Sequence, residues 1–109
     1  MEYLEFSLLS GVDGCRYDVR FRNLITGIAP RHSDTADVQF LVNEMPVVVA
    51  LPLVALSRQK QRAGRPMSDG EVIHTAALIL KETLEKQGVG EEGMITPAVE
   101  QTLEAAAKL

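Results

Sequence analysis

The side chains of this sequence with the most chemical possibilities gather in one short polar segment, from Arg31 to Asp37. His32 lies there with Asp34 and Asp37, and an imidazole with nearby carboxylates is a donor set that divalent metal ions accept. Ser33 adds a hydroxyl group that a neighbouring base could activate as a nucleophile. The spacing matches no established ligand or catalytic motif, and short polar residues are typical of turns. We therefore interpret the segment as a loop, with an enzyme site centred on His32 as the alternative.

The other two candidates, Cys15 and His74, stand in isolated contexts. Cys15 is flanked by Gly14 and Arg16, and no histidine or second cysteine nearby supports a reactive thiolate. His74 falls on the polar face of a predicted helix, with no second ligand or nucleophile within one turn. The sequence also contains no glycine-rich phosphate loop, paired zinc-ligand motif or nucleophile elbow. We predict a protein that is not an enzyme, with no catalytic residue, metal site or cofactor.

Positive charge is densest between Ser57 and Arg65, which holds four of the eleven Lys and Arg residues. These four residues are Arg58, Lys60, Arg62 and Arg65. A basic run before a turn and a helix could bind nucleic-acid phosphates, as in a helix-turn-helix. Cations in the last turns of a helix also interact favourably with its dipole, which is the structural interpretation. The connection from Gly64 to Asp69 is longer than the tight turn of such motifs, so nucleic-acid binding is the alternative function.

Length and composition predict a single domain over residues 1–109. The chain is 46% hydrophobic and 24% charged, close to the globular average, and is long enough for one core. Its net charge of −4 argues against general attraction to nucleic acid or to anionic membranes. One cysteine allows no intramolecular disulfide. Since neither a signal-peptide pattern nor a bilayer-length apolar stretch is present, we predict a cytoplasmic protein without a membrane partner.

The elements that must position these residues are clearest between Ser68 and Val89, where one helix is specified from end to end. Ser68 and Glu71 match a capping box, in which each side chain bonds the backbone amide of the other residue. Gly88 suits the left-handed position after the last turn, where Val89 could fold back on Leu84. The apolar residues at helical spacing predict one buried face. They are Val72, Ile73, Ala76, Ala77, Ile79, Leu80 and Leu84.

Two β-hairpins are predicted before that helix. In the first, a loop at Gly11 to Gly14 pairs Phe6 with Val19 on one face and Glu5 with Arg20 on the other. The same register pairs Leu4 with Phe21, Leu8 with Tyr17 and Tyr3 with Arg22. A slip by one residue would destroy the matches on both faces, so the pattern specifies this register.

The second hairpin is predicted from Asp37 to Leu51, with Asn43 to Pro46 as its turn. This turn pairs Val42 with Val47, and Phe40 with Val49. It places Leu41 beside Val48 on the outer face of the sheet. Apolar residues on both faces of a strand predict that both faces are covered, or that one face meets a partner.

Two more helices complete the predicted fold. Pro52 is suited to the start of a helix over Leu53 to Ala63, with Gly64 as its stop. Thr96 and Pro97 open a last helix. We therefore predict an α+β fold in which an antiparallel sheet of about four strands, in two hairpins, precedes three helices (ββββααα). At least two helices should pack on one face of the sheet.

The predicted surface favours self-association over catalysis. Leu41 and Val48 lie on the outer sheet face, and Leu78 interrupts the polar face of the helix that begins at Ser68. We expect these three residues to be interface candidates in a homodimer. The predicted function is a non-catalytic protein-interaction module that self-associates.

Overall fold

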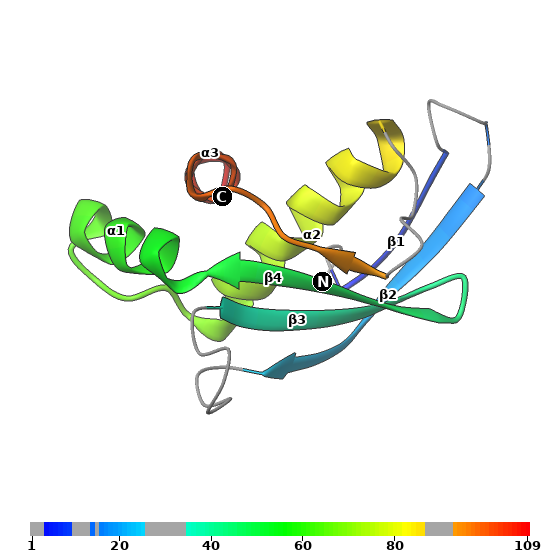
Figure 1. Cartoon of the computed structure of the whole chain (residues 1–109), viewed down its shortest axis with the longest axis horizontal. Coiled ribbons are helices and arrows are strands. Elements are labelled where there is room, and N and C mark those ends of the chain that lie inside the picture. The colour runs from blue at the N-terminus through cyan, green and yellow to red at the C-terminus, as the bar shows by residue number, and fades with distance from the viewer. Residues whose placement is uncertain (1–3, 10–13, 15, 26–34, 87–92) are drawn as a thin grey trace.

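In the computed structural model, the described residues are 4–9, 14, 16–25, 35–86 and 93–109, and they form one sheet and three helices (Figure 1). The strands are β1 (Glu5–Leu9), β2 (Arg16–Ile25), β3 (Thr35–Val42), β4 (Met45–Pro52) and β5 (Met94–Ile95). The helices are α1 (Leu53–Ala63), α2 (Asp69–Lys86) and α3 (Val99–Ala107). The α+β class is confirmed, with four antiparallel strands followed by helices.

The sheet follows the order of the chain, β1-β2-β3-β4-β5. Its fifth strand was not predicted: β5 lies parallel to β4, with Val48 opposite Met94 and Val49 opposite Ile95. The Val48 amide also donates to the Gly93 carbonyl oxygen at 2.9 Å. Because β5 has two residues, it is too short to show the alternation by which a strand is recognised.

The register of the first hairpin is confirmed. Phe6 lies opposite Val19 and Glu5 opposite Arg20, and the Phe21 amide donates to the Leu4 carbonyl oxygen. The predicted pairing of Tyr3 and the loop residues 11–13 lie outside the described residues. Beyond Phe21 the register with β3 shifts by one residue. This bulge brings Leu24 opposite Val38, and thus onto the helix-facing side of the sheet. β2 continues as a strand beyond the bulge.

The register predicted for the second hairpin is wrong by two residues. Val42 pairs with Met45, and Phe40 pairs with Val47. The chain reverses at Asn43 and Glu44, whose φ angles of 50° and 68° are both positive, as the tight turns of two-residue hairpins require. A shift by two residues leaves every side chain on its predicted face, because the pleat has a period of two.

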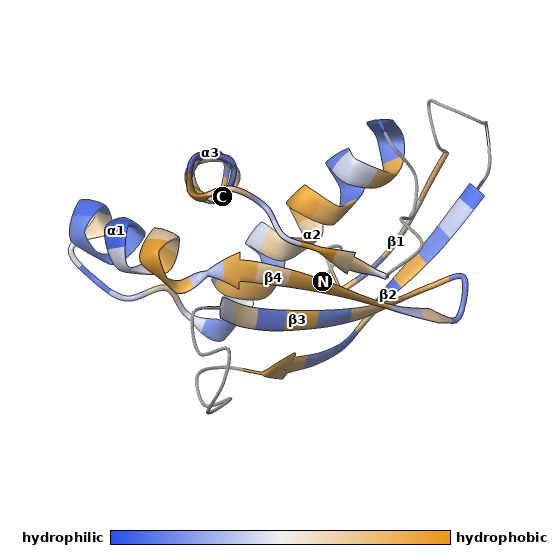
Figure 2. Cartoon of the chain, viewed as in Figure 1, coloured by the Kyte–Doolittle hydropathy of each residue, from blue (hydrophilic) through white to orange (hydrophobic). Residues whose placement is uncertain are grey.

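The core lies between the sheet and the helices. In β3 the residues that face the helices are buried and those that face away are half-buried. On β4, Val47, Val49 and Leu51 are buried, and they meet Ile79 and Leu80 of α2 in one cluster. Figure 2 shows this hydrophobic stretch along β4 and on the middle of α2. The predicted packing of helices on one sheet face is therefore confirmed (Figure 1).

The predicted helix boundaries hold at Ser68 and at Gly64, but the start predicted for the last helix at Thr96 and Pro97 is wrong. α3 begins at Val99, with Ala98 in the capping position and no side-chain cap. The Glu71 amide donates to Ser68 Oγ at 3.2 Å, and the Ser68 amide donates to Glu71 Oε1 at 3.0 Å, so the capping box is formed. Gly64 ends α1 in the left-handed conformation, with φ of 76°. The ending predicted at Gly88 and Val89 lies outside the described residues. Within the described chain, no helix combines the length and the apolar character needed to cross a membrane.

Candidate functional site

The candidate site is the sheet face that points away from the helices, which we call the outer face. Its apolar part consists of Leu41, Val48 and Met94, and we call these three residues the outer-face patch. Val48 lies between Gln39 on β3 and Met94 on β5, and Leu41 lies diagonally across from Val48. Leu41 and Val48 are half-buried, and Met94 is 51% exposed. The predicted pair therefore does lie together on the outer face.

The β1–β2 end of the outer face is polar. Asp18 accepts a hydrogen bond from Ser7 Oγ at 2.7 Å and an ion-paired hydrogen bond from Arg16 Nε at 3.1 Å. These two donors, Ser7 first, hold the pKa of the Asp18 carboxyl below its ordinary value. Arg20 lies opposite Glu5 in the register, yet its guanidinium pairs with Glu44 at 2.8 Å. The charges of this region thus largely satisfy one another.

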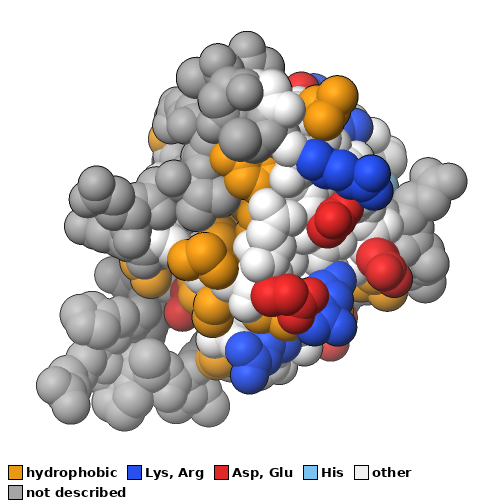
Figure 3. Space-filling view, turned by 90° about the vertical axis from the view of Figure 1, so that its right-hand side faces the viewer, with side chains coloured by type: hydrophobic (Ala, Val, Ile, Leu, Met, Phe, Trp, Pro, Cys, Tyr) orange, Lys and Arg blue, Asp and Glu red, His pale blue; other side chains and the backbone are white. Residues whose placement is uncertain are grey.

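The same mixture of charge is visible at the end of the molecule that lies on the right of Figure 1. Figure 3 faces this end and shows acidic and basic side chains side by side on the described surface, with apolar side chains between them. No large area of one charge appears in this view of the described side chains. Charge of both signs is therefore mixed over this end of the described surface.

Leu78 is separated from the outer-face patch. It lines a groove of about 350 Å³ between α2 and α3, on the helix side of the sheet. Charged side chains of both signs line the rest of this groove, among them Lys81, Glu85, Glu104 and Lys108. Leu78 is half-buried there and packs against the core. The structure therefore brings Leu41 and Val48 together but does not add Leu78 to them.

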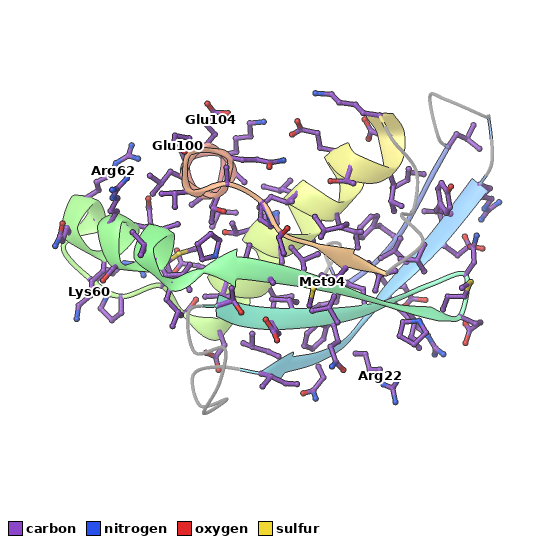
Figure 4. The ribbon with its side chains drawn as sticks, in the orientation of Figure 1. Arg22, Lys60, Arg62, Met94, Glu100 and Glu104 are labelled. Atoms are coloured by element: carbon purple, nitrogen blue, oxygen red, sulfur yellow. The ribbon has the colours of Figure 1, made fainter. Side chains whose placement is uncertain are left out.

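The four basic residues of the predicted nucleic-acid site do not share one surface. Figure 4 shows Lys60 and Arg62 on opposite sides of α1. Arg65 donates to both carboxylate oxygens of Glu71, at 2.7 and 3.0 Å. This ion pair, together with the Ser68 amide, lowers the pKa of Glu71 from its ordinary value of 4.5 to about 2. Arg65 thus supports the start of α2, and Arg58 and Arg62, one helical turn apart, are left as a row of two exposed cations.

The structure describes only some of the residues that the sequence offers as candidates for catalysis or metal binding. His32, Ser33, Asp34 and Cys15 lie outside the described residues. Asp37 accepts a hydrogen bond from Thr35 Oγ1 at 2.8 Å. His74 is half-buried on α2. Over residues 4–9, 14, 16–25, 35–86 and 93–109, no three His, Cys, Asp or Glu side chains gather closely enough to hold a metal ion.

Met94 is the member of the outer-face patch that sequence reasoning missed. It precedes Ile95 and Thr96 in a stretch without regular alternation, so nothing local marks it as a strand residue. Its place on the outer face depends on the pairing of β5 with β4, which is a long-range contact. The one local signal is a methionine followed by a β-branched pair, which is weak evidence for an edge strand.

Comparison of the chain with protein families, with curated proteins and with solved structures gives no match. Its function therefore has to be inferred from the chemistry of its own surfaces.

Proposed function

We propose that this protein is a non-catalytic interaction module that self-associates through its outer sheet face. Two copies meet at the outer-face patch (Leu41, Val48 and Met94), related by a two-fold axis. The observation that carries the proposal is the asymmetry of the sheet, whose helix-facing side is buried while the patch on its other side lies under none of the described helices.

The chemistry of the outer face suits a second copy as the partner. A two-fold axis brings the same patch of each copy together, so the patch must tolerate its own chemistry. Val48 and Leu41 meet apolar side chains under that operation. Beside them, Arg20 and Glu44 neutralise each other and supply a polar rim. An apolar centre with a polar rim is the usual arrangement of a protein interface.

A lysine at Val48 tests this interface, because it would place ammonium groups close together across the axis. Val48→Lys should halve the molar mass measured by light scattering at high micromolar concentration, with the far-UV circular dichroism spectrum unchanged. Val54→Lys is the matched control, since Val54 is 54% exposed and belongs to α1 rather than to the sheet. An equal mass for Val48→Lys and Val54→Lys would rule out the outer-face patch as the interface.

Nucleic-acid binding through Arg58, Lys60, Arg62 and Arg65 is the second candidate function. The exposure of Arg58 and Arg62 on one side of α1 favours it. If it is correct, the unmutated protein should be retained on nucleic acid at low salt, and Arg58→Gln with Arg62→Gln should abolish retention. Arg65→Gln should lower stability rather than retention, because the Arg65 guanidinium is already paired with the Glu71 carboxylate. Absence of retention at low salt would exclude this function.

A further inference from the structure

Over the described residues, the strand at one edge of the sheet, β1, has little of the usual protection of an edge. In the described part of the chain its only neighbouring strand is β2. It is five residues long and contains no proline, no lysine and no bulge, and Glu5 is its only charged residue. The opposite edge is β5, which is kept short at two residues. Proteins commonly shorten, charge or bulge their edge strands to prevent pairing with another chain, and β1 shows little of this.

The backbone direction of β1 shows which groups are left for a further strand. The Phe21 amide donates to the Leu4 carbonyl oxygen, so Leu4 directs its backbone groups toward β2. Because these directions alternate along an antiparallel strand, Phe6 and Leu8 also bond β2. The N–H and C=O groups of Glu5, Ser7 and Leu9 consequently point away from the sheet.

The sequence of β1 is complementary to itself in the antiparallel direction. A two-fold axis through Ser7 sets Ser7 opposite its own copy, Glu5 opposite Leu9, and Phe6 opposite Leu8. Apolar side chains then meet on the helix-facing side and no like charges lie directly opposite each other. The nearest like charges across the axis are Glu5 of one copy and Asp18 of the other, which lie two strand spacings and two residues apart, or about 12 Å. That distance exceeds the Debye length of about 8 Å at physiological ionic strength.

The core is also incomplete at this edge. Phe6 and Leu8 are half-buried on the helix-facing side, whereas Val38 and Val49 in the middle of the sheet are fully buried. Leu9, on the outer side, is 66% exposed. A second strand along β1 would cover these side chains and would pair with the outward-pointing backbone groups of Glu5, Ser7 and Leu9.

From these observations we infer that β1 pairs antiparallel with β1 of a second copy, so that two sheets continue as one across a two-fold axis at Ser7. This contact is independent of the outer-face patch, because β1 and β5 lie at opposite edges of the sheet. Where the two two-fold axes meet at right angles, a chain that uses both contacts assembles four copies, and loss of either contact leaves two.

Light scattering on matched lysine variants tests the edge contact. Ser7→Lys places two ammonium groups opposite each other at the axis and should halve the molar mass of the unmutated protein. Ser57→Lys is the matched control, since Ser57 is exposed on α1, and it should leave the mass unchanged. Ser7→Lys combined with Val48→Lys should give the monomer mass of 11.9 kDa.

The two proposed interfaces fail in different ways in this experiment. If Val48→Lys halves the mass and folded Ser7→Lys does not, the edge contact is wrong and the outer-face interface stands. The converse result rejects the outer-face interface and retains the edge contact.

Amide hydrogen exchange on the unmutated protein gives a second test that does not depend on the folding of a variant. The edge contact predicts slow exchange at Ser7 and Leu9, comparable with Phe6, at high micromolar concentration. Fast exchange at Ser7 and Leu9 beside slow exchange at Phe6 would overturn the inference.

Discussion

At the scale of single residues, the Glu71 side chain connects the start of α2 to the segment that precedes it. One of its carboxylate oxygens accepts from the Ser68 amide, and both accept from the Arg65 guanidinium. The carboxylate also lies in the first turn of α2, where the helix dipole favours negative charge. The Gly64–Ser68 connection between the two helices is therefore fixed to α2 by one side chain.

The lowered pKa of Glu71 makes the contribution of this side chain depend on pH. The carboxyl titrates at about 2 in the folded chain, against an ordinary value of 4.5. Above 4.5 both folded and unfolded chains carry the charge, and its stabilising contacts are fully present. Between 4.5 and 2 the unfolded chain binds a proton that the folded chain does not, so this stabilisation declines as the pH falls.

We therefore expect Glu71→Gln to lower the free energy of unfolding at pH 7, and this difference from the unmutated protein to shrink between pH 4.5 and pH 2. Urea denaturation followed by circular dichroism at several pH values measures it. Glu85→Gln, exposed on the same helix, is the control. A Glu71→Gln difference that stays constant from pH 7 to pH 2.5 would contradict the described contacts.

At the scale of secondary-structure elements, the turn between β3 and β4 contains an unfavourable residue. Asn43 tolerates a positive φ angle, and its side chain is held because Nδ2 donates to the Arg16 carbonyl oxygen and Oδ1 accepts from the Asp18 amide. Glu44 has the same type of conformation, at φ of 68°, which costs roughly 1 kcal/mol for a residue with a Cβ atom. Its ion pair with Arg20 is exposed on both sides and offsets little of this cost.

We expect Glu44→Gly to raise the free energy of unfolding by about 0.5–1 kcal/mol, because glycine adopts this φ angle without strain. Glu44→Gln is the matched control: it removes the charge but keeps the strained backbone, and should be no more stable than the unmutated protein. Chemical denaturation midpoints compare the two variants. If Glu44→Gly proves no more stable than Glu44→Gln, the two-residue turn is not the one formed in solution.

The two hairpins also show why one register could be predicted and the other could not. In the first, apolar matches such as Phe6 with Val19 coincide with the charge match of Glu5 and Arg20, so one register satisfies both faces. In the second, Val47, Val48 and Val49 offer similar partners to β3 in registers two residues apart. The turn then determines which of these registers forms, and nothing in the sequence indicates that Glu44 adopts a positive φ angle.

The candidate site was predictable to a similar, limited degree. The outer-face position of Leu41 and Val48 depends only on the pleat period, which survives the error in register. The position of Leu78 could not be predicted, because it depends on which element packs beside α2. Helical periodicity gives the direction of a side chain but does not identify its neighbour. α3 lies next to it and leaves it lining the groove between the two helices. Met94 required the long-range pairing of β5 with β4.

At the scale of the whole molecule, the sheet separates a face that the helices cover from a face that none of the described helices covers. The helix-facing side holds the core, and the outer face carries an apolar patch beside a charge-balanced region. The two edges differ as well, since β5 has only two residues and β1, among the described strands, is paired on one side only. These features support the proposal that the chain self-associates.

The most direct test of this claim is the molar mass of the unmutated chain, measured by light scattering from low to high micromolar concentration. Self-association predicts a mass that rises above 11.9 kDa and reaches a whole multiple of it at high micromolar concentration. The mass should stay high in moderate salt, because the proposed contacts are mainly apolar and backbone contacts rather than exposed ion pairs. A constant mass of 11.9 kDa at high micromolar concentration would rule out self-association.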